Sequence, residues 1–171
     1  METALKLPAH GSPFGGLLKA IQARIDDDQS VASNAEPHKR FKKFADMTPL
    51  QTHDIVTEGL PVVLAREMMA EYEVVGREDV LQAIGVSERT LQRGKDNERL
   101  LDSNASDRLL RLAAVTEHAI DVFGSKDAAE RWLVTPALAL DQRKPIDLLQ
   151  SSEGAELVKS LLIRIDYGVY S

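Results

Sequence analysis

The chain has 171 residues, 43% of them hydrophobic, and is therefore long enough to bury a core in one domain or one domain with a small appendage. Its 27 acidic and 21 basic residues give a formal net charge of −6, which excludes a protein that coats nucleic acid through its whole surface. The lack of cysteine excludes disulfides, thiolate metal sites and cysteine nucleophiles, and fits a reducing compartment.

The N-terminal residues lack the basic start, apolar middle and cleavage pattern of a secretion signal. No stretch approaches the roughly 20 apolar residues that a membrane-spanning helix needs. We therefore expect a soluble, cytoplasmic protein with no membrane partner.

Residues 1–59 are expected to form an N-terminal helix and a flexible region. Apolar residues from Phe14 to Ile25 recur at helical spacing. Small and polar residues follow, and then a basic stretch at 38–43 with aromatic neighbours. We interpret this stretch as a solvated face with its aromatics packed inward, with nucleic-acid contact as the alternative.

Residues 60–120 carry the pattern of a helix-turn-helix domain. Helical spacing begins near Leu60, and a short helix is predicted over 77–84, followed by a tight turn at Gly85. Ser87 is a natural N-cap for the next helix, which we expect to continue to Leu101. A further helix, capped by Ser103 or Asn104, carries an apolar stripe through 109–119.

The second helix of such a motif can enter the major groove if its first turns carry donors for phosphates and base edges. The candidate DNA-binding residues are Ser87, Arg89, Thr90, Gln92, Arg93 and Lys95. Because residues 77–111 hold seven basic and seven acidic side chains, we expect moderate and steeply salt-dependent DNA binding. The alternative is a protein-interaction module whose arginines are merely solvated.

Residues 121–171 predict a second, smaller helical domain. A helix is expected over 126–133, then a helix start at Thr135 and Pro136, and a short turn opened by Pro145. The last helix starts near Ser152 and ends before Gly168. Its predicted apolar side comprises Leu157, Val158, Leu161, Leu162 and Ile165. No segment alternates with period two, so the predicted fold class is all-α.

No catalytic, cofactor-binding or metal-binding site is predicted. The glycines are scattered rather than clustered into a phosphate-binding loop. The four histidines (His10, His38, His53 and His118) are far apart, and nothing like a nucleophile elbow accompanies His53 and Asp54. The chain is therefore expected not to be an enzyme.

The tail Tyr167–Ser171 follows a well-patterned helix and combines tyrosines with a carboxylate. Such a peptide can fill a pocket, because tyrosine offers a large contact area at low entropic cost and a carboxylate can occupy an anion site. The alternative is a frayed terminus.

Several separated motifs, in order, carry a resemblance to a known family. They are GVSERTLQR at 85–93, RLLRL at 108–112, AERWL at 129–133, PIDLL at 145–149, Gly154, and RIDYGVY at 164–170. Together they resemble the Xre/MbcA/ParS family of antitoxins, over about residues 60–171.

This resemblance implies an all-helical, homodimeric protein that inhibits a RES-domain toxin and represses its own operon through an Xre-like helix-turn-helix domain. The toxin would be an enzyme that degrades NAD or transfers ADP-ribose, and the antitoxin's C-terminal domain would obstruct its active site within a larger complex. The implied toxin-binding residues are Trp132, Arg164, Asp166, Tyr167, Gly168, Val169, Tyr170 and Ser171. Of these, we expect Trp132 to serve mainly as a core residue of that domain.

A second hypothesis is that the protein is a dimeric helix-turn-helix regulator without a toxin partner. Such a regulator would respond to a small molecule bound by its C-terminal domain. Co-purification with the product of a neighbouring gene would separate the two. The toxin's reaction, the operator sequence, the stoichiometry of the complex and the role of residues 1–59 stay open.

Overall fold

A computed structural model describes residues 49–93 and 99–168, so the first predicted helix and the basic stretch lie outside the described residues. Its helices are α2 (Pro49–Glu58), α3 (Val62–Glu71), α4 (Arg77–Ile84), α5 (Glu88–Arg93), α6 (Ser103–Phe123), α7 (Lys126–Val134), the 3-10 helix η2 (Leu138–Leu140), α8 (Pro145–Leu148) and α9 (Ser152–Asp166). The described residues contain two isolated β-bridges and no strand, which confirms the predicted all-α fold.

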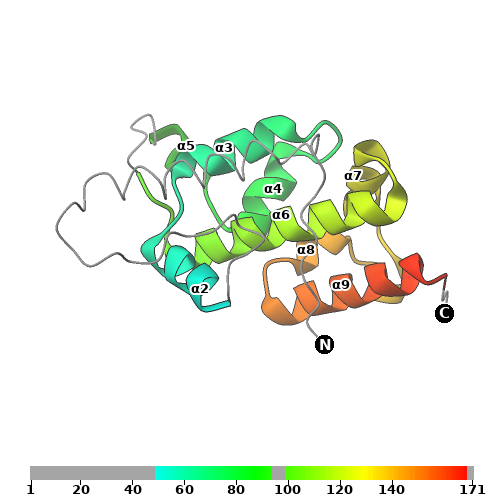
Figure 1. Cartoon of the computed structure of the whole chain (residues 1–171). Coiled ribbons are helices and arrows are strands. Elements are labelled where there is room, and N and C mark those ends of the chain that lie inside the picture. Colours follow the sequence, from blue (N-terminus) through cyan, green and yellow to red (C-terminus); the bar gives the residue numbers. More distant parts are fainter. Residues whose placement is uncertain (1–48, 94–98, 169–171) are drawn as a thin grey trace.

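Helix α6 is the longest helix and runs through the middle of the molecule (Figure 1). In the view of Figure 1, α3, α4 and α5 lie above it and α9 lies below it, while α8 packs against α4 as well as against α9. Its N-cap is Asp102, whose carboxylate accepts the Ala105 N–H at 2.8 Å, so the predicted cap at Ser103 or Asn104 was late by one or two residues. It ends at Gly124, whose φ of 76° is the left-handed conformation that favours glycine.

One continuous hydrophobic core supports all these helices. Leu109 and Leu112 of α6 are fully buried and lie in the same cluster as Met68 of α3 and Leu162 of α9. Each such side chain contributes about 1.5–3 kcal/mol when it leaves water, so helices on both sides of α6 depend on the same packing.

The helix-turn-helix segment agrees with the sequence prediction at its centre. Helix α4 spans the predicted residues, Gly85 adopts a left-handed φ of 71°, and the Ser87 hydroxyl accepts the Thr90 N–H at 3.2 Å. Two features differ. Helix α2 was not predicted, and it begins within the region expected to be flexible.

The second difference is at Leu100 and Leu101, where the predicted continuation of the helix from Ser87 was wrong. Leu100 forms a bridge with Pro61 instead, and the Leu101 N–H donates to the Leu60 carbonyl at 2.7 Å. This extended backbone is satisfied by partners about 40 residues away, a pairing that local helical spacing does not reveal.

After α7 the structure corrects a second predicted cap. Thr135 ends α7 rather than starting a helix, since its hydroxyl donates to the Arg131 carbonyl at 2.6 Å. Helix α8 begins at Pro145 as predicted, and the Ser151 hydroxyl caps α9 by accepting the Gly154 N–H at 3.0 Å. A Cβ atom at residue 154 would overlap the Leu148 carbonyl oxygen, so only glycine permits this approach of α9 to α8.

Candidate functional sites

Helix α5 presents a polar face beside the turn at Gly85. Leu91 anchors the helix in the core, whereas Ser87, Arg89 and Gln92 are exposed and Thr90 is half-buried. The structure therefore brings these four candidate DNA-binding residues together on α5 and the residue before it. The Arg93 side chain and the whole of Lys95 lie outside the described residues.

An ion pair between α4 and α5 controls the charge of this face. The Arg77 guanidinium donates two hydrogen bonds of 2.8 Å to the two carboxylate oxygens of Glu88, and these bonds lower the pKa of that carboxyl below its usual value. Because this pair neutralises Glu88, the positive charge of Arg89 remains for a partner. The Gln92 amide also donates to Glu88, at 3.2 Å, and must release that bond before it donates to a base.

The described candidate toxin-binding residues comprise one half-buried residue and four exposed ones. Trp132 is half-buried and packs on Phe123, with ring centroids 5.4 Å apart, as expected of a residue that supports the domain. Arg164, Asp166, Tyr167 and Gly168 are exposed at the end of α9. Val169, Tyr170 and Ser171 lie outside the described residues.

Three other exposed apolar side chains lie in this part of the chain. Leu138 of η2 is 82% exposed, and Leu157 and Ile163 of α9 are 59% and 47% exposed. The prediction that Leu157 faces the core was wrong, because Ala155, Val158 and Leu162 centre the buried side of α9 elsewhere.

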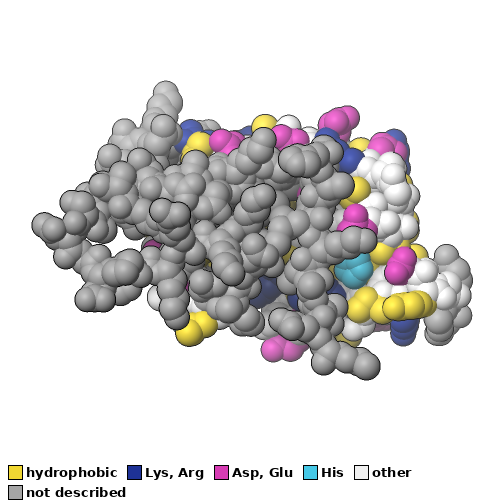
Figure 2. All heavy atoms as spheres, viewed as in Figure 1, with side chains coloured by type: hydrophobic (Ala, Val, Ile, Leu, Met, Phe, Trp, Pro, Cys, Tyr) yellow, Lys and Arg dark blue, Asp and Glu magenta, His cyan; other side chains and the backbone are white. Residues whose placement is uncertain are grey.

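Tyr167, at 78% exposure, follows Ile163 by four residues, so the two side chains lie near each other at the C-terminal end of α9. Figure 2 shows hydrophobic atoms gathered there. Sequence analysis did not single out Ile163, although the run Leu161–Leu162–Ile163 contained the signal: three successive residues cannot share the buried side of one helix.

The backbone around Leu138, which begins η2, is constrained by the loop that follows this helix. Asp141 and Gln142 both have left-handed φ values, 57° and 58°, which are uncommon for residues other than glycine. The Ala137 carbonyl accepts the N–H groups of Leu140 and Gln142, each at 3.0 Å, and the Ala137 N–H donates to Arg143 at 3.1 Å. The loop is thus closed by its own backbone hydrogen bonds while Leu138 faces solvent.

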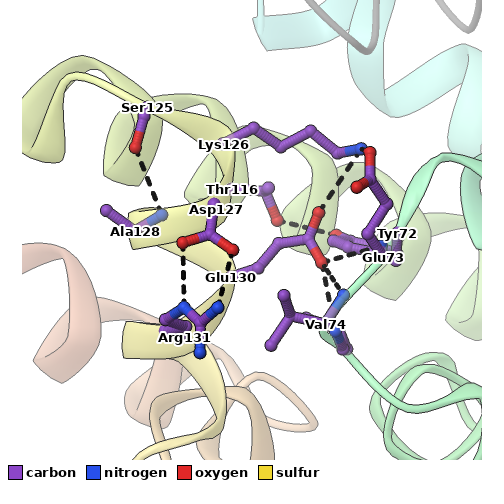
Figure 3. Close-up of polar contacts among 11 residues, drawn as sticks. Tyr72, Glu73, Val74, Thr116, Ser125, Lys126, Asp127, Ala128, Glu130 and Arg131 are labelled. Carbon is purple, nitrogen blue, oxygen red and sulfur yellow. Dashed lines mark hydrogen bonds and ion pairs between the residues drawn. The ribbon is translucent and has the colours of Figure 1, made fainter.

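A buried carboxylate lies where α7 meets the turn between α3 and α4. Glu130 of α7 is 0% exposed, and its Oε2 atom accepts the N–H groups of Glu73, Val74 and Val75 at 2.9, 2.6 and 3.1 Å (Figure 3). Nearby, the Tyr72 hydroxyl and the Thr116 hydroxyl share a hydrogen bond of 2.7 Å, and burial raises the pKa of the Tyr72 phenol above its usual range. Sequence analysis missed Glu130.

Within 49–93 and 99–168, no group of three or more His, Asp or Glu side chains is placed to hold a metal ion. In the same part of the chain, no helix has the length and apolarity needed to cross a bilayer.

Comparison with known proteins identifies both halves of the described fold. Residues 51–114 match the antitoxin Xre-like helix-turn-helix domain, and residues 118–168 match the antitoxin Xre/MbcA/ParS C-terminal toxin-binding domain. The first match thus takes in α2, and the second takes in α7 through α9.

Similar whole proteins agree with these matches. Antitoxin Xre of Photorhabdus laumondii is 31% identical over 118 residues, which cover 68% of this chain and 79% of the relative. Antitoxin Xre of Yersinia enterocolitica is 33% identical over 98 residues, or 57% of this chain and 66% of the relative. A Prs ADP-ribosylating antitoxin of a Sphingobium species is 24% identical over 144 residues, or 79% and 90% of the two chains. The chain therefore belongs to the Xre/MbcA/ParS family of antitoxins.

Proposed function

We propose that this antitoxin inhibits a RES-domain toxin that consumes NAD, by obstructing the toxin's active site with α9 and the tail that follows it. We further propose that it acts in the cytoplasm as a homodimer and represses its own operon through α5. In this assignment, residues 60–120 read DNA, residues 121–171 bind the toxin, and the chain itself catalyses no reaction.

The exposed apolar surface at the end of α9 carries the toxin-binding proposal. Ile163 and Tyr167 lie in water although the same helix buries Val158 and Leu162, and they lie within the segment that matches a toxin-binding domain. Exposed apolar side chains grouped on one surface of a soluble protein mark interaction sites. Tyrosine is also among the residues that carry most binding energy at protein interfaces.

The chemistry of the tail supports occupancy of a nucleotide pocket. Asp166 lies exposed beside Tyr167 at the end of α9. An NAD site needs cationic groups to hold the pyrophosphate, and carboxylates form charge-assisted hydrogen bonds with such groups. An acidic and aromatic segment can therefore replace the dinucleotide at its own contacts. The name of the Sphingobium relative associates that protein with ADP-ribosylation, which is chemistry of the same NAD-consuming class.

Two features of α5 support the proposal that it reads DNA. The side chain of Arg89 is exposed, and the neighbouring carboxylate of Glu88 is paired with Arg77. The Arg77–Glu88 pair removes a negative charge that would repel phosphate. Ser87 and Thr90 share a hydrogen bond of 2.9 Å, which holds two hydroxyls at the start of α5 where a phosphate oxygen can meet them. Dimerisation would double these contacts and compensate for the neutral charge of the segment.

One paired experiment tests both activities. We expect deletion of 167–171 to abolish protection of cellular NAD against the co-expressed toxin while leaving operator binding intact. We expect the double variant Arg89→Ala, Arg93→Ala to lose operator binding and keep full protection, so that each variant is the folding control for the other. If cells with the deletion variant and the toxin keep the same NAD level as cells with the full-length antitoxin, the proposal that the tail occupies the toxin's active site is refuted. Loss of both activities in either variant would contradict the assignment to separate surfaces.

A further inference from the structure

Glu130 lies in the segment that matches the toxin-binding domain, but its hydrogen-bond partners lie in the segment that matches the DNA-binding domain. Its three partners are consecutive backbone N–H groups, 55–57 residues earlier in the chain. They belong to the turn that follows the end of α3, and all three converge on the single atom Oε2 (Figure 3). Three N–H groups aimed at one point form a concave anion site, which here is filled by a side chain of the protein.

Lys126 contacts the other carboxylate oxygen of Glu130 and also the side chain of Glu73. Its Nζ atom lies 3.6 Å from Oε1 of Glu130 and donates to Oε1 of Glu73 at 2.8 Å. Oε1 of Glu130 is buried and has no hydrogen-bond partner among the described residues. One ammonium group thus balances the buried charge and also joins α7 to the turn, so the carboxylate is held from both sides.

The turn leads directly to the helix that precedes α5. Gly76 is the N-cap of α4 and makes no side-chain capping hydrogen bond, and the three N–H groups that Glu130 accepts lie directly before it in the chain. Arg77, the first residue of α4, makes the two hydrogen bonds to Glu88, the first residue of α5. The hydrogen bonds of Glu130 to residues 73–75, the backbone from 75 to 77 and the Arg77–Glu88 pair therefore connect α7 to the start of α5.

We propose that Glu130 is a positioning residue for DNA reading: from the toxin-binding part of the chain it fixes the turn before α4, and through Arg77 and Glu88 it fixes the orientation of α5. This inference rests on the proposed role of α5 in operator binding. Glu130 itself contacts no DNA, because it is fully buried.

Four forms of the full-length protein test this role: wild type, Glu130→Ala, Glu130→Gln and Asp127→Asn. Alanine removes the acceptor from all three N–H groups, whereas the glutamine side-chain oxygen can still accept them. Asp127 is the matched control, because it lies on the same helix and pairs with Arg131 in solvent rather than with the turn. The measurements are amide hydrogen exchange, binding to a DNA fragment carrying the gene's own promoter, and neutralisation of the neighbouring-gene toxin.

For Glu130→Ala we expect exchange at the N–H groups of Glu73, Val74 and Val75 to become about tenfold faster or more than in the wild type. We expect promoter affinity to fall about tenfold and neutralisation to stay within about twofold. Glutamine should restore promoter affinity to within about threefold of the wild type, and Asp127→Asn should change none of the three measurements. Retained neutralisation by Glu130→Ala separates positioning from a general loss of stability, which would impair both activities.

Three results would overturn the proposal: unchanged exchange at the turn, faster exchange with unchanged promoter affinity, or no rescue by glutamine. If Glu130→Ala does not fold, Glu130→Asp replaces it, since the shorter carboxylate withdraws from the turn and keeps its charge; wild-type promoter affinity in that variant would equally overturn the proposal. A wild-type protein that binds no promoter DNA would refute the proposed operator binding, and the positioning of α5 with it. The exchange data would still report separately whether Glu130 holds the turn.

Discussion

The two candidate surfaces of this antitoxin differ in the chemistry that they leave in water. On α5 the exposed groups are hydroxyls, an amide and a guanidinium, and the one acidic side chain is paired with Arg77. At the end of α9 the exposed groups include two large apolar side chains, Ile163 and Tyr167, beside the charged Arg164 and Asp166. The first set suits a partner made of phosphates and base edges, and the second suits a protein pocket. The chemistry of each surface, more than its shape, distinguishes its partner.

The largest expected effect comes from removing the apolar contacts on α9. We expect Ile163→Asp combined with Tyr167→Ala to weaken toxin binding by at least about 100-fold, because truncation of central interface residues costs about 2–4 kcal/mol. The measurement is the dissociation constant of the purified antitoxin–toxin pair. Ser152→Ala, at the exposed start of the same helix, serves as the control and should bind as the wild type does. Wild-type affinity in the double variant would place the toxin contact elsewhere.

Alanine substitutions at Gly154 and Gly85 should lower the free energy of unfolding by different amounts in the C-terminal part and in the helix-turn-helix part. Gly154→Ala should lower the free energy of unfolding by about 2–3 kcal/mol, because its Cβ would press on the backbone carbonyl of Leu148 and separate α9 from α8. Gly85→Ala should cost only about 1–2 kcal/mol, since its left-handed φ is strained but the nearest obstacle is the flexible end of Arg108.

Urea unfolding of the wild type and the two variants measures both costs. Equal losses, or a larger loss at Gly85, would contradict the packing described for α8 and α9.

The smallest expected effect is the acid sensitivity of the two exposed ion pairs. Hydrogen bonds from Arg77 and from Arg131 lower the carboxyl pKa of Glu88 and of Asp127, respectively. A lowered pKa in the folded state gives stability that is present above the unfolded-state value, near 4.5 for Glu88 and 3.8 for Asp127, and is lost as the pH falls further.

We therefore expect Glu88→Gln and Asp127→Asn each to be slightly less stable than the wild type at pH 7, and the difference to shrink as the pH falls below the unfolded-state value of each carboxyl. Thermal unfolding over a series of pH values measures it. A difference that grows on acidification would have the wrong sign for both pairs. Both carboxylates are exposed, so the two sides of the molecule should respond alike.

Much of the fold is predictable because its signals are local. Gly85 and Ser87 end or begin helices through conformations and hydrogen bonds within a few residues, and the sequence places both correctly. Pro145 at the start of α8 is a signal of the same kind. Where one residue decides its own surroundings, spacing and propensity are enough.

The failures involve partners distant in the chain. Leu100 pairs with Pro61, and no periodicity within 87–101 contains that information. Thr135 followed by proline has the composition of a helix start, but the hydroxyl donates backwards to Arg131. Glu130 left no signal at all, because its partners are backbone N–H groups, which any residue except proline supplies.

The candidate sites were predicted unevenly for the same reason. Arg89 and Gln92 follow from the helix-turn-helix pattern, and Tyr167 from the family motif at the end of the chain. Leu138 and Ile163 were missed, because their exposure depends on which side of η2 and α9 the core occupies. Only tertiary packing determines that side.

The single core built around α6 bears on how relatives of this protein diversify. A cut at residue 120 would divide α6 near its end, and fully buried residues from both parts, such as Met68 and Leu162, belong to one cluster. Recombination that joins the N-terminal part of one antitoxin to the C-terminal part of another would therefore combine core residues that do not pack together. Under the proposed role of α9, new toxin specificity would arise instead by gradual replacement of its exposed side chains, while the buried residues of both parts are inherited together.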